Sequence, residues 1–109
     1  MSSNDLLKQL CAAIKSANVE DVRNILSTGE VDINRETSDW YRTRPIILAA
    51  AGGHRDIIAT LLDQPQLDPN LCDGLFGNTA LIDASHAGNT DVVQQLILDK
   101  RYHTHRFPI

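Results

Sequence analysis

The stretch "AAAGGHRDIIATLLDQPQLDPN", residues 49–70, is the most informative part of this chain of 109 residues. It opens with an alanine-rich segment that favours a helix, and Gly52 and Gly53 then interrupt that segment. A second apolar segment with helical spacing begins at once and stops near Pro65. The stretch therefore predicts two short antiparallel helices with a tight turn between them, in place of one long helix.

The same arrangement occurs twice more along the chain. Residues 84–105, "ASHAGNTDVVQQLILDKRYHTH", repeat it 35 positions later. Residues 13–34, "AIKSANVEDVRNILSTGEVDIN", repeat it 36 positions earlier, with Ala17 at the place of the turn glycine. Three copies in phase identify a repeat protein.

Each copy can be interpreted physically. Its first helix is rich in alanine, whose small side chain lets neighbouring helices approach closely. A glycine, Gly53 or Gly88, then supplies the positive φ that closes this helix. The second helix begins with an acidic residue that suits the helix dipole, and its apolar residues form one stripe. The polar stretches between copies are too long for simple turns, so we expect extended fingers that project from the helical stack.

The segments "RPIILAAAGGHRDIIATLLDQPQLDPN" and "GNTALIDASHAGNTDVVQQLI" resemble the ankyrin-repeat pattern. The resemblance implies an all-α solenoid of helix-turn-helix units joined by extended finger loops. We expect a single domain over residues 1–109, with a capping repeat at 1–36, a second repeat at 37–72, a third at 73–109 and a C-terminal tail at 100–109.

Several positions depart from the family pattern. Arg44 replaces the capping threonine of repeat two, while Ala80 replaces the proline and Asp83 the usual histidine of repeat three. The chain ends before a fourth finger. Either the tail caps the stack or the chain is the first part of a longer protein, and we favour the second interpretation.

Composition and motifs exclude several functions. The net charge of −4 does not predict nucleic-acid binding, and we expect the basic residues of the tail, Lys100, Arg101 and Arg106, to be solvated or neutralising. No apolar run approaches the ~20 residues of a membrane span, and no secretory signal is evident. There is no phosphate-binding loop, nucleophile elbow or other catalytic set, so we predict no enzymatic activity, no cofactor and no small-molecule substrate.

Cysteines and histidines have ordinary explanations. Cys11 and Cys72 do not form a metal or redox motif, so we interpret both as small packing residues of a cytoplasmic or otherwise intracellular protein. His103 and His105, with Asp99 nearby, could hold a metal only with further ligands, so we interpret them as solvated and predict no metal site.

The resemblance implies binding of a partner protein through the finger tips and the exposed face of the first helices. We expect "DWYR" and "GLFG" to anchor the partner, because tyrosine, tryptophan and arginine dominate interface energetics. The alternative is that the finger aromatics fold back over the core. The candidate partner-binding residues are Asp39, Trp40, Tyr41, Arg42, Leu75, Phe76, Asn78, Lys15 and His86.

A second function class stays open. The chain could be the non-catalytic ankyrin segment of a larger enzyme or effector whose chemistry lies outside residues 1–109. We expect a monomer, with self-association through the C-terminal repeat as the weaker alternative.

Overall fold

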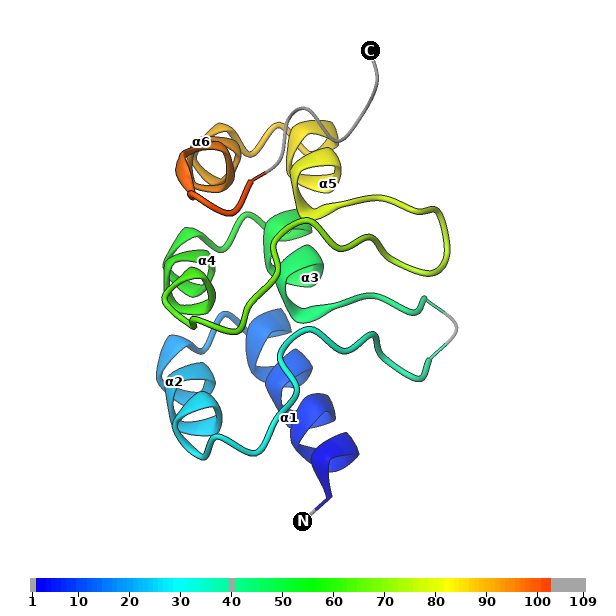
Figure 1. Ribbon diagram of the computed structural model, residues 1–109, viewed down its shortest axis with the longest axis vertical. Helices are drawn as coiled ribbons and strands as arrows, with labels where there is room; N and C mark the ends of the chain where they lie inside the picture. Colours follow the sequence, from blue (N-terminus) through cyan, green and yellow to red (C-terminus); the bar gives the residue numbers. More distant parts are fainter. Residues whose placement is uncertain (1, 40, 103–109) are drawn as a thin grey trace.

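The computed structural model describes residues 2–39 and 41–102. Within these residues the regular structure is entirely helical, which confirms the predicted all-α class (Figure 1). The six helices form three antiparallel pairs, and their bounds are α1 Ser3–Lys15, α2 Val19–Ser27, α3 Pro45–Ala51, α4 Arg55–Leu62, α5 Ala80–His86 and α6 Thr90–Leu98.

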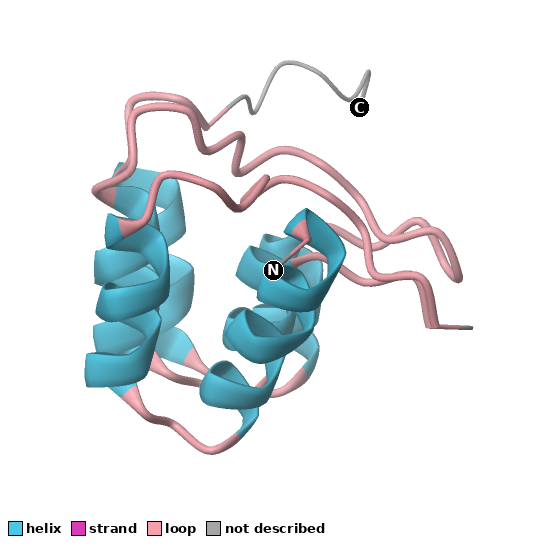
Figure 2. Ribbon diagram, turned by 90° about the horizontal axis from the view of Figure 1, so that it is seen from below, coloured by secondary structure: helices cyan, strands magenta, loops and turns pink. Residues whose placement is uncertain are grey.

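The pairs stack into two layers of an elongated molecule of 44 × 26 × 24 Å. Helix α3 packs between α1 and α5, and α4 packs between α2 and α6. Two finger loops leave the stack on the same side, beyond the first-helix layer (Figure 2). We name residues 35–44 the first finger and residues 71–79 the second finger. None of the described helices is long and apolar enough to cross a bilayer.

The glycine pair of repeat two has two separate roles. Gly53 adopts a φ of +70°, and its counterpart Gly88 adopts +73°, as the repeat pattern predicts. Ala17 takes the same left-handed conformation, at +56°, although its Cβ makes that region unfavourable. Gly52 serves a different purpose, because a Cβ there would collide with the imidazole of His54.

Helix starts follow the sequence expectations. Pro45 occupies the first position of α3, where its missing N–H costs nothing. The hydroxyl of Thr79 accepts a hydrogen bond from the Ile82 N–H and caps α5. Arg44, at the equivalent position before α3, makes no side-chain cap.

The core is aliphatic and runs through all three repeats. The predicted stripe of the second helices is buried at Leu61, which is 0% exposed, and at Leu96, which is 2% exposed. Burial of each such side chain stabilises the fold by roughly 1.5–3 kcal/mol. The prediction was wrong for Ile97, which is 48% exposed, because the described helices pack against α6 from repeat two and from its own unit alone. The largest fully buried aliphatic side chains are Leu10, Ile14, Val22, Ile33, Ile46, Ile47, Ile57, Ile58, Leu61, Val92 and Leu96.

The two cysteines differ. Cys11 is buried in α1, and this burial raises the pKa of its thiol to about 11, so its predicted packing role is confirmed. The same prediction was wrong for Cys72, which is exposed. Cys72 pairs with Thr79 in an isolated antiparallel bridge at the base of the second finger, and a side chain there faces solvent.

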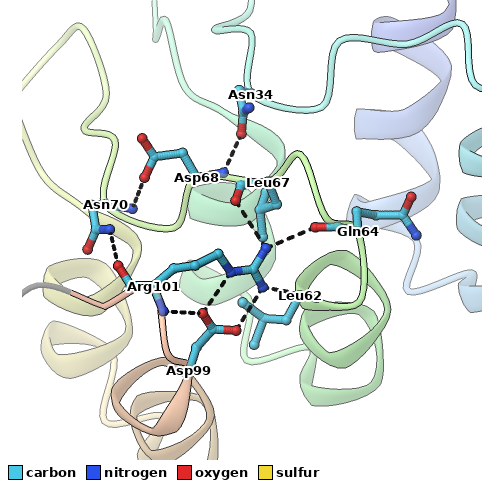
Figure 3. Close-up of polar contacts among 8 residues, drawn as sticks. All are labelled: Asn34, Leu62, Gln64, Leu67, Asp68, Asn70, Asp99 and Arg101. Atoms are coloured by element: carbon cyan, nitrogen blue, oxygen red, sulfur yellow. Dashed lines mark hydrogen bonds and ion pairs between the residues drawn. The ribbon is translucent and has the colours of Figure 1, made fainter.

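Arg101, one of the basic tail residues expected to be solvated or neutralising, takes the neutralising role, because it pairs with the carboxylate of Asp99. The Arg101 side chain is only 30% exposed, and its guanidinium donates hydrogen bonds to the main-chain oxygens of Leu62, at the end of α4, and of Gln64 and Leu67, in the segment after α4 (Figure 3). Asp99 pairs with the same guanidinium at 2.7 Å. The Leu62 carbonyl lacks a helical partner because α4 ends there. The arginine supplies a donor to it and to two carbonyls of the following segment, and so fastens repeat three to repeat two.

Asparagines tie successive repeats together in the same region. Asn34 accepts a hydrogen bond from the Asp68 N–H at 2.8 Å and donates one to the Gln66 carbonyl at 2.7 Å. One repeat later, Asn70 donates to the Arg101 carbonyl at 2.5 Å (Figure 3). The closing D-x-N of the repeat pattern is therefore a connector between units.

Candidate partner-binding groove

A groove of about 530 Å³ lies between the two fingers and the first helices. Ile47, Leu48 and Ala51 of α3 form its floor. Two residue types dominate the rest of the lining, apolar side chains and aspartates. The other lining residues are Lys15 of α1, Asp39, Tyr41 and Thr43 of the first finger, Asp73, Leu75, Phe76 and Asn78 of the second finger, and Asp83 of α5.

An aspartate shapes the tip of the first finger. Asp39 Oδ1 accepts hydrogen bonds from the Thr37 hydroxyl at 2.7 Å and from the N–H groups of Tyr41 and Arg42 at 3.1 Å. The Thr37 bond, with the two N–H groups and the charge of Lys15 in support, holds the pKa of Asp39 below its ordinary value. A charged Asp39 is thus built into the fingertip.

The second finger uses the same device. Asp73 is nearly buried, and its Oδ1 accepts hydrogen bonds from the N–H groups of Phe76 at 2.7 Å and Gly77 at 3.0 Å. Both tips therefore close around a carboxylate, and in both the adjacent aromatic side chain is left on the outside.

The two fingers are bonded to each other. The Arg42 carbonyl accepts a hydrogen bond from the Gly74 N–H at 2.9 Å, and the Arg42 guanidinium donates to the Gly74 carbonyl. Nearer the stack, Arg44 donates to the Cys72 carbonyl at 2.8 Å and to the Asn34 carbonyl at 2.6 Å. These bonds fix the spacing of the fingers and so preorganise the groove.

The finger aromatics point outward. Tyr41 is 57% exposed and Phe76 is 76% exposed, so neither folds back over the core. Leu75 is half-buried and lines the groove with them. Trp40 lies outside the described residues.

The structure brings six of the nine predicted residues into one groove: Lys15, Asp39, Tyr41, Leu75, Phe76 and Asn78. Arg42 is committed to Gly74, between the fingers, and His86 is exposed at the end of α5 outside the groove lining. Sequence reasoning missed Asp73 and Asp83. Asp83 carried a signal, because it stands where the repeat pattern has histidine, and its Oδ1 accepts a hydrogen bond from the Asn78 side chain at 3.0 Å.

Among residues 2–39 and 41–102, no three or more histidine, cysteine, aspartate or glutamate side chains are grouped to hold an ion. Asp99 is bound to Arg101, and His103 and His105 lie outside the described residues.

Comparison with known proteins adds a family and one solved relative. Residues 10–106 match the family model for ankyrin repeats in three copies. No curated protein matches the chain. A similar chain, with a TM-score of 0.76 and 28% identity, comes from the solved complex of the predatory endopeptidase Bd0816 from Bdellovibrio bacteriovorus with immunity protein Bd3460. The match covers 87% of this chain and 47% of that chain, so this chain spans about half of the other's length.

Proposed function

This chain belongs to the ankyrin-repeat family, and on that premise we propose that it binds a partner protein in the groove between its fingers and first helices. Ankyrin repeats are protein-interaction modules. One observation carries the choice of site: Tyr41 and Phe76, both largely exposed, stand over the apolar floor of α3. Aromatic side chains around an apolar depression are the usual centre of an interface.

The rigidity of the groove supports the proposal. Arg42 and Arg44 bond one finger to the other, so little ordering of these loops remains to be done when a partner docks. Preorganisation of this kind increases affinity because less conformational entropy is lost on binding.

The solved relative gives separate support. A chain with this fold is found in a complex of an endopeptidase with an immunity protein, so the scaffold occurs in a protein assembly. We assign the present chain a binding role and no catalytic one, whether it acts alone or within a longer protein. Its intracellular location stays a prediction.

The test is affinity capture from lysate with wild type and with the Tyr41→Ala/Phe76→Ala double variant. Ile97→Ala/Leu98→Ala is the matched control, because these side chains are 48% and 81% exposed and lie on α6, away from the groove. All three proteins must first show the same circular dichroism spectrum.

We expect a protein that is retained by wild type and by the control but lost by the groove variant. With that protein purified, the groove variant should bind it at least tenfold more weakly, which corresponds to about 1.4 kcal/mol. Equal capture by all three proteins would place the binding site elsewhere.

A further inference from the structure

We propose that the groove accepts a partner segment in which a lysine or arginine lies beside an apolar or aromatic side chain. This inference rests on the proposed function and specifies the chemistry of the partner at the same site.

Charge is the first argument. Three carboxylates line the groove, Asp39, Asp73 and Asp83, against the single ammonium group of Lys15. They come from both fingers and from α5, so they surround the apolar floor from several sides. A concave site with low-dielectric walls concentrates such a field, which attracts cationic groups and repels anionic ones.

The second argument is that each of these carboxylates has one oxygen that can accept a hydrogen bond from a partner. In the part of the chain that the structure describes, the hydrogen bonds to Asp39, Asp73 and Asp83 all end on Oδ1. The hydrogen bonds within the protein therefore use one oxygen of each carboxylate, and Oδ2 can accept from an incoming ammonium or guanidinium group. A charge-assisted hydrogen bond of this kind is stronger than a neutral one.

The third argument is the apolar part of the lining. Leu48 and Ala51 on the floor, with Leu75 on the wall, present hydrocarbon to any occupant. A cation alone would leave this apolar surface exposed to water, whereas an adjacent apolar side chain would cover it. The ring faces of Tyr41 and Phe76 can contact either component, because aromatic rings attract cations as well as hydrocarbon.

The shape favours a short segment over a large flat surface. A volume of about 530 Å³ is within the roughly 300–1,000 Å³ range of pockets that enclose compact ligands. The groove therefore has room for a few neighbouring side chains of one partner loop or terminus. An acidic segment would meet three carboxylates and is excluded on charge.

The probe for this inference is a phage-displayed library of random peptides, selected on immobilised protein. Three variants are selected in parallel: Asp39→Asn/Asp83→Asn, which keeps an oxygen for each fingertip bond but removes two charges; Tyr41→Ala/Phe76→Ala; and Asp56→Asn/Asp63→Asn. The last is the matched charge control, because both residues are exposed and lie at α4, outside the groove.

We expect wild type and the matched control to enrich peptides with a lysine or arginine beside an apolar residue. Synthetic versions of these peptides, measured by fluorescence anisotropy, should bind Asp39→Asn/Asp83→Asn about three- to tenfold more weakly, as two partly exposed ion pairs imply. Raising the salt concentration should remove most of that difference.

The outcomes separate the two proposals. Enriched peptides that need Tyr41 and Phe76 but lack positive charge, or bind the Asn variant equally well, would overturn the charge inference and leave groove binding intact. A selection that enriches the same peptides on the Tyr41→Ala/Phe76→Ala variant, or that enriches none, would overturn both.

Discussion

Repeats two and three have nearly the same pattern but different surroundings. Ile47 of α3 and Ile82 of α5 are the same residue type 35 positions apart, yet Ile47 is 1% exposed and Ile82 is only half-buried. Similarly, Ile58 is fully buried, whereas its counterpart Val93 is half-buried. The reason is that helices pack on both sides of repeat two, while the described helices cover repeat three on one side alone.

Burial of a side chain in a solenoid therefore depends on the repeats that flank its own. Each unit is stabilised by its own two helices and by the interfaces on either side. Repeat three, which has one such interface among the described helices, holds fewer buried side chains than repeat two. Repeat three partly compensates through Arg101, which reaches back to the end of α4.

We expect the largest losses of stability for substitutions at positions that are buried equally in repeats two and three. Leu61 and Leu96 are 0% and 2% exposed, so this position is buried equally in both repeats. We expect Leu61→Ala and Leu96→Ala each to cost about 2–5 kcal/mol of unfolding free energy. Urea unfolding followed by circular dichroism measures this, and a Leu96→Ala cost below half that of Leu61→Ala would contradict it.

The next pair tests the comparison directly. Ile47→Ala should cost about 2–5 kcal/mol, and Ile82→Ala about half as much, because the second side chain is already partly in water. Because both variants replace isoleucine by alanine in a helix, the change in helix propensity is the same, and the difference between their costs reports burial. Equal costs in the same urea experiment would mean that repeat three is covered as fully as repeat two.

Removal of the Arg101 side chain, which fastens repeat three to repeat two, should reduce stability by a smaller amount. Arg101→Ala leaves the carbonyls of Leu62, Gln64 and Leu67 without this donor, so we expect a loss of about 1–3 kcal/mol. Lys100→Ala, at an exposed neighbour of the same charge, should change stability by less than about 0.5 kcal/mol. Thermal unfolding of the two variants distinguishes the loss of the Arg101 hydrogen bonds from a general effect of removing a positive charge.

The smallest predicted effect is a pH dependence of stability that arises from the ion pair between Asp99 and Arg101. Hydrogen bonds from Arg101 lower the pKa of Asp99 below its ordinary value of 3.8. The carboxylate therefore stabilises the fold at pH values above about 3.8, and this contribution is lost as the pH falls through the lower pKa of the folded state.

Asp99→Asn should accordingly be less stable than wild type near neutral pH, and the gap should narrow in acid. In an Arg101→Ala background the same substitution should show little pH dependence, since the interacting partner is gone. Urea unfolding at a series of pH values measures both differences, and a gap that stays constant from neutral pH into strong acid would refute the assignment.

Most of the fold could be predicted from the sequence because its determinants are local and repeated. The alanine-rich first helices, the turn glycines Gly53 and Gly88 and the apolar stripe at Leu61 and Leu96 each appear in phase. The bonds from Arg101 to repeat two escaped prediction because their acceptors lie 34 to 39 positions earlier in the chain and are main-chain oxygens, which leave no signature in the side-chain pattern.

The candidate site likewise contains some features that could be predicted from the sequence and some that could not. Tyr41 and Phe76 could be found because they stand out as aromatics in polar loops, and both are exposed. The link from Arg42 to Gly74 could not, since it joins residues 32 positions apart through backbone groups. Asp73 was missed because its role depends on the conformation of its own fingertip, where it accepts two N–H bonds.

The asparagine connectors constrain how a chain of this kind can change in length. Asn34 reaches 32 and 34 positions forward, and Asn70 reaches 31 positions forward, so each bond depends on the number of residues in one unit. Duplication or deletion of a complete unit carries its connector along and recreates the same bond at the new junction. Gain or loss of one residue within a helix would instead displace a connector from its target. Evolution can therefore lengthen or shorten this scaffold most easily by whole repeats.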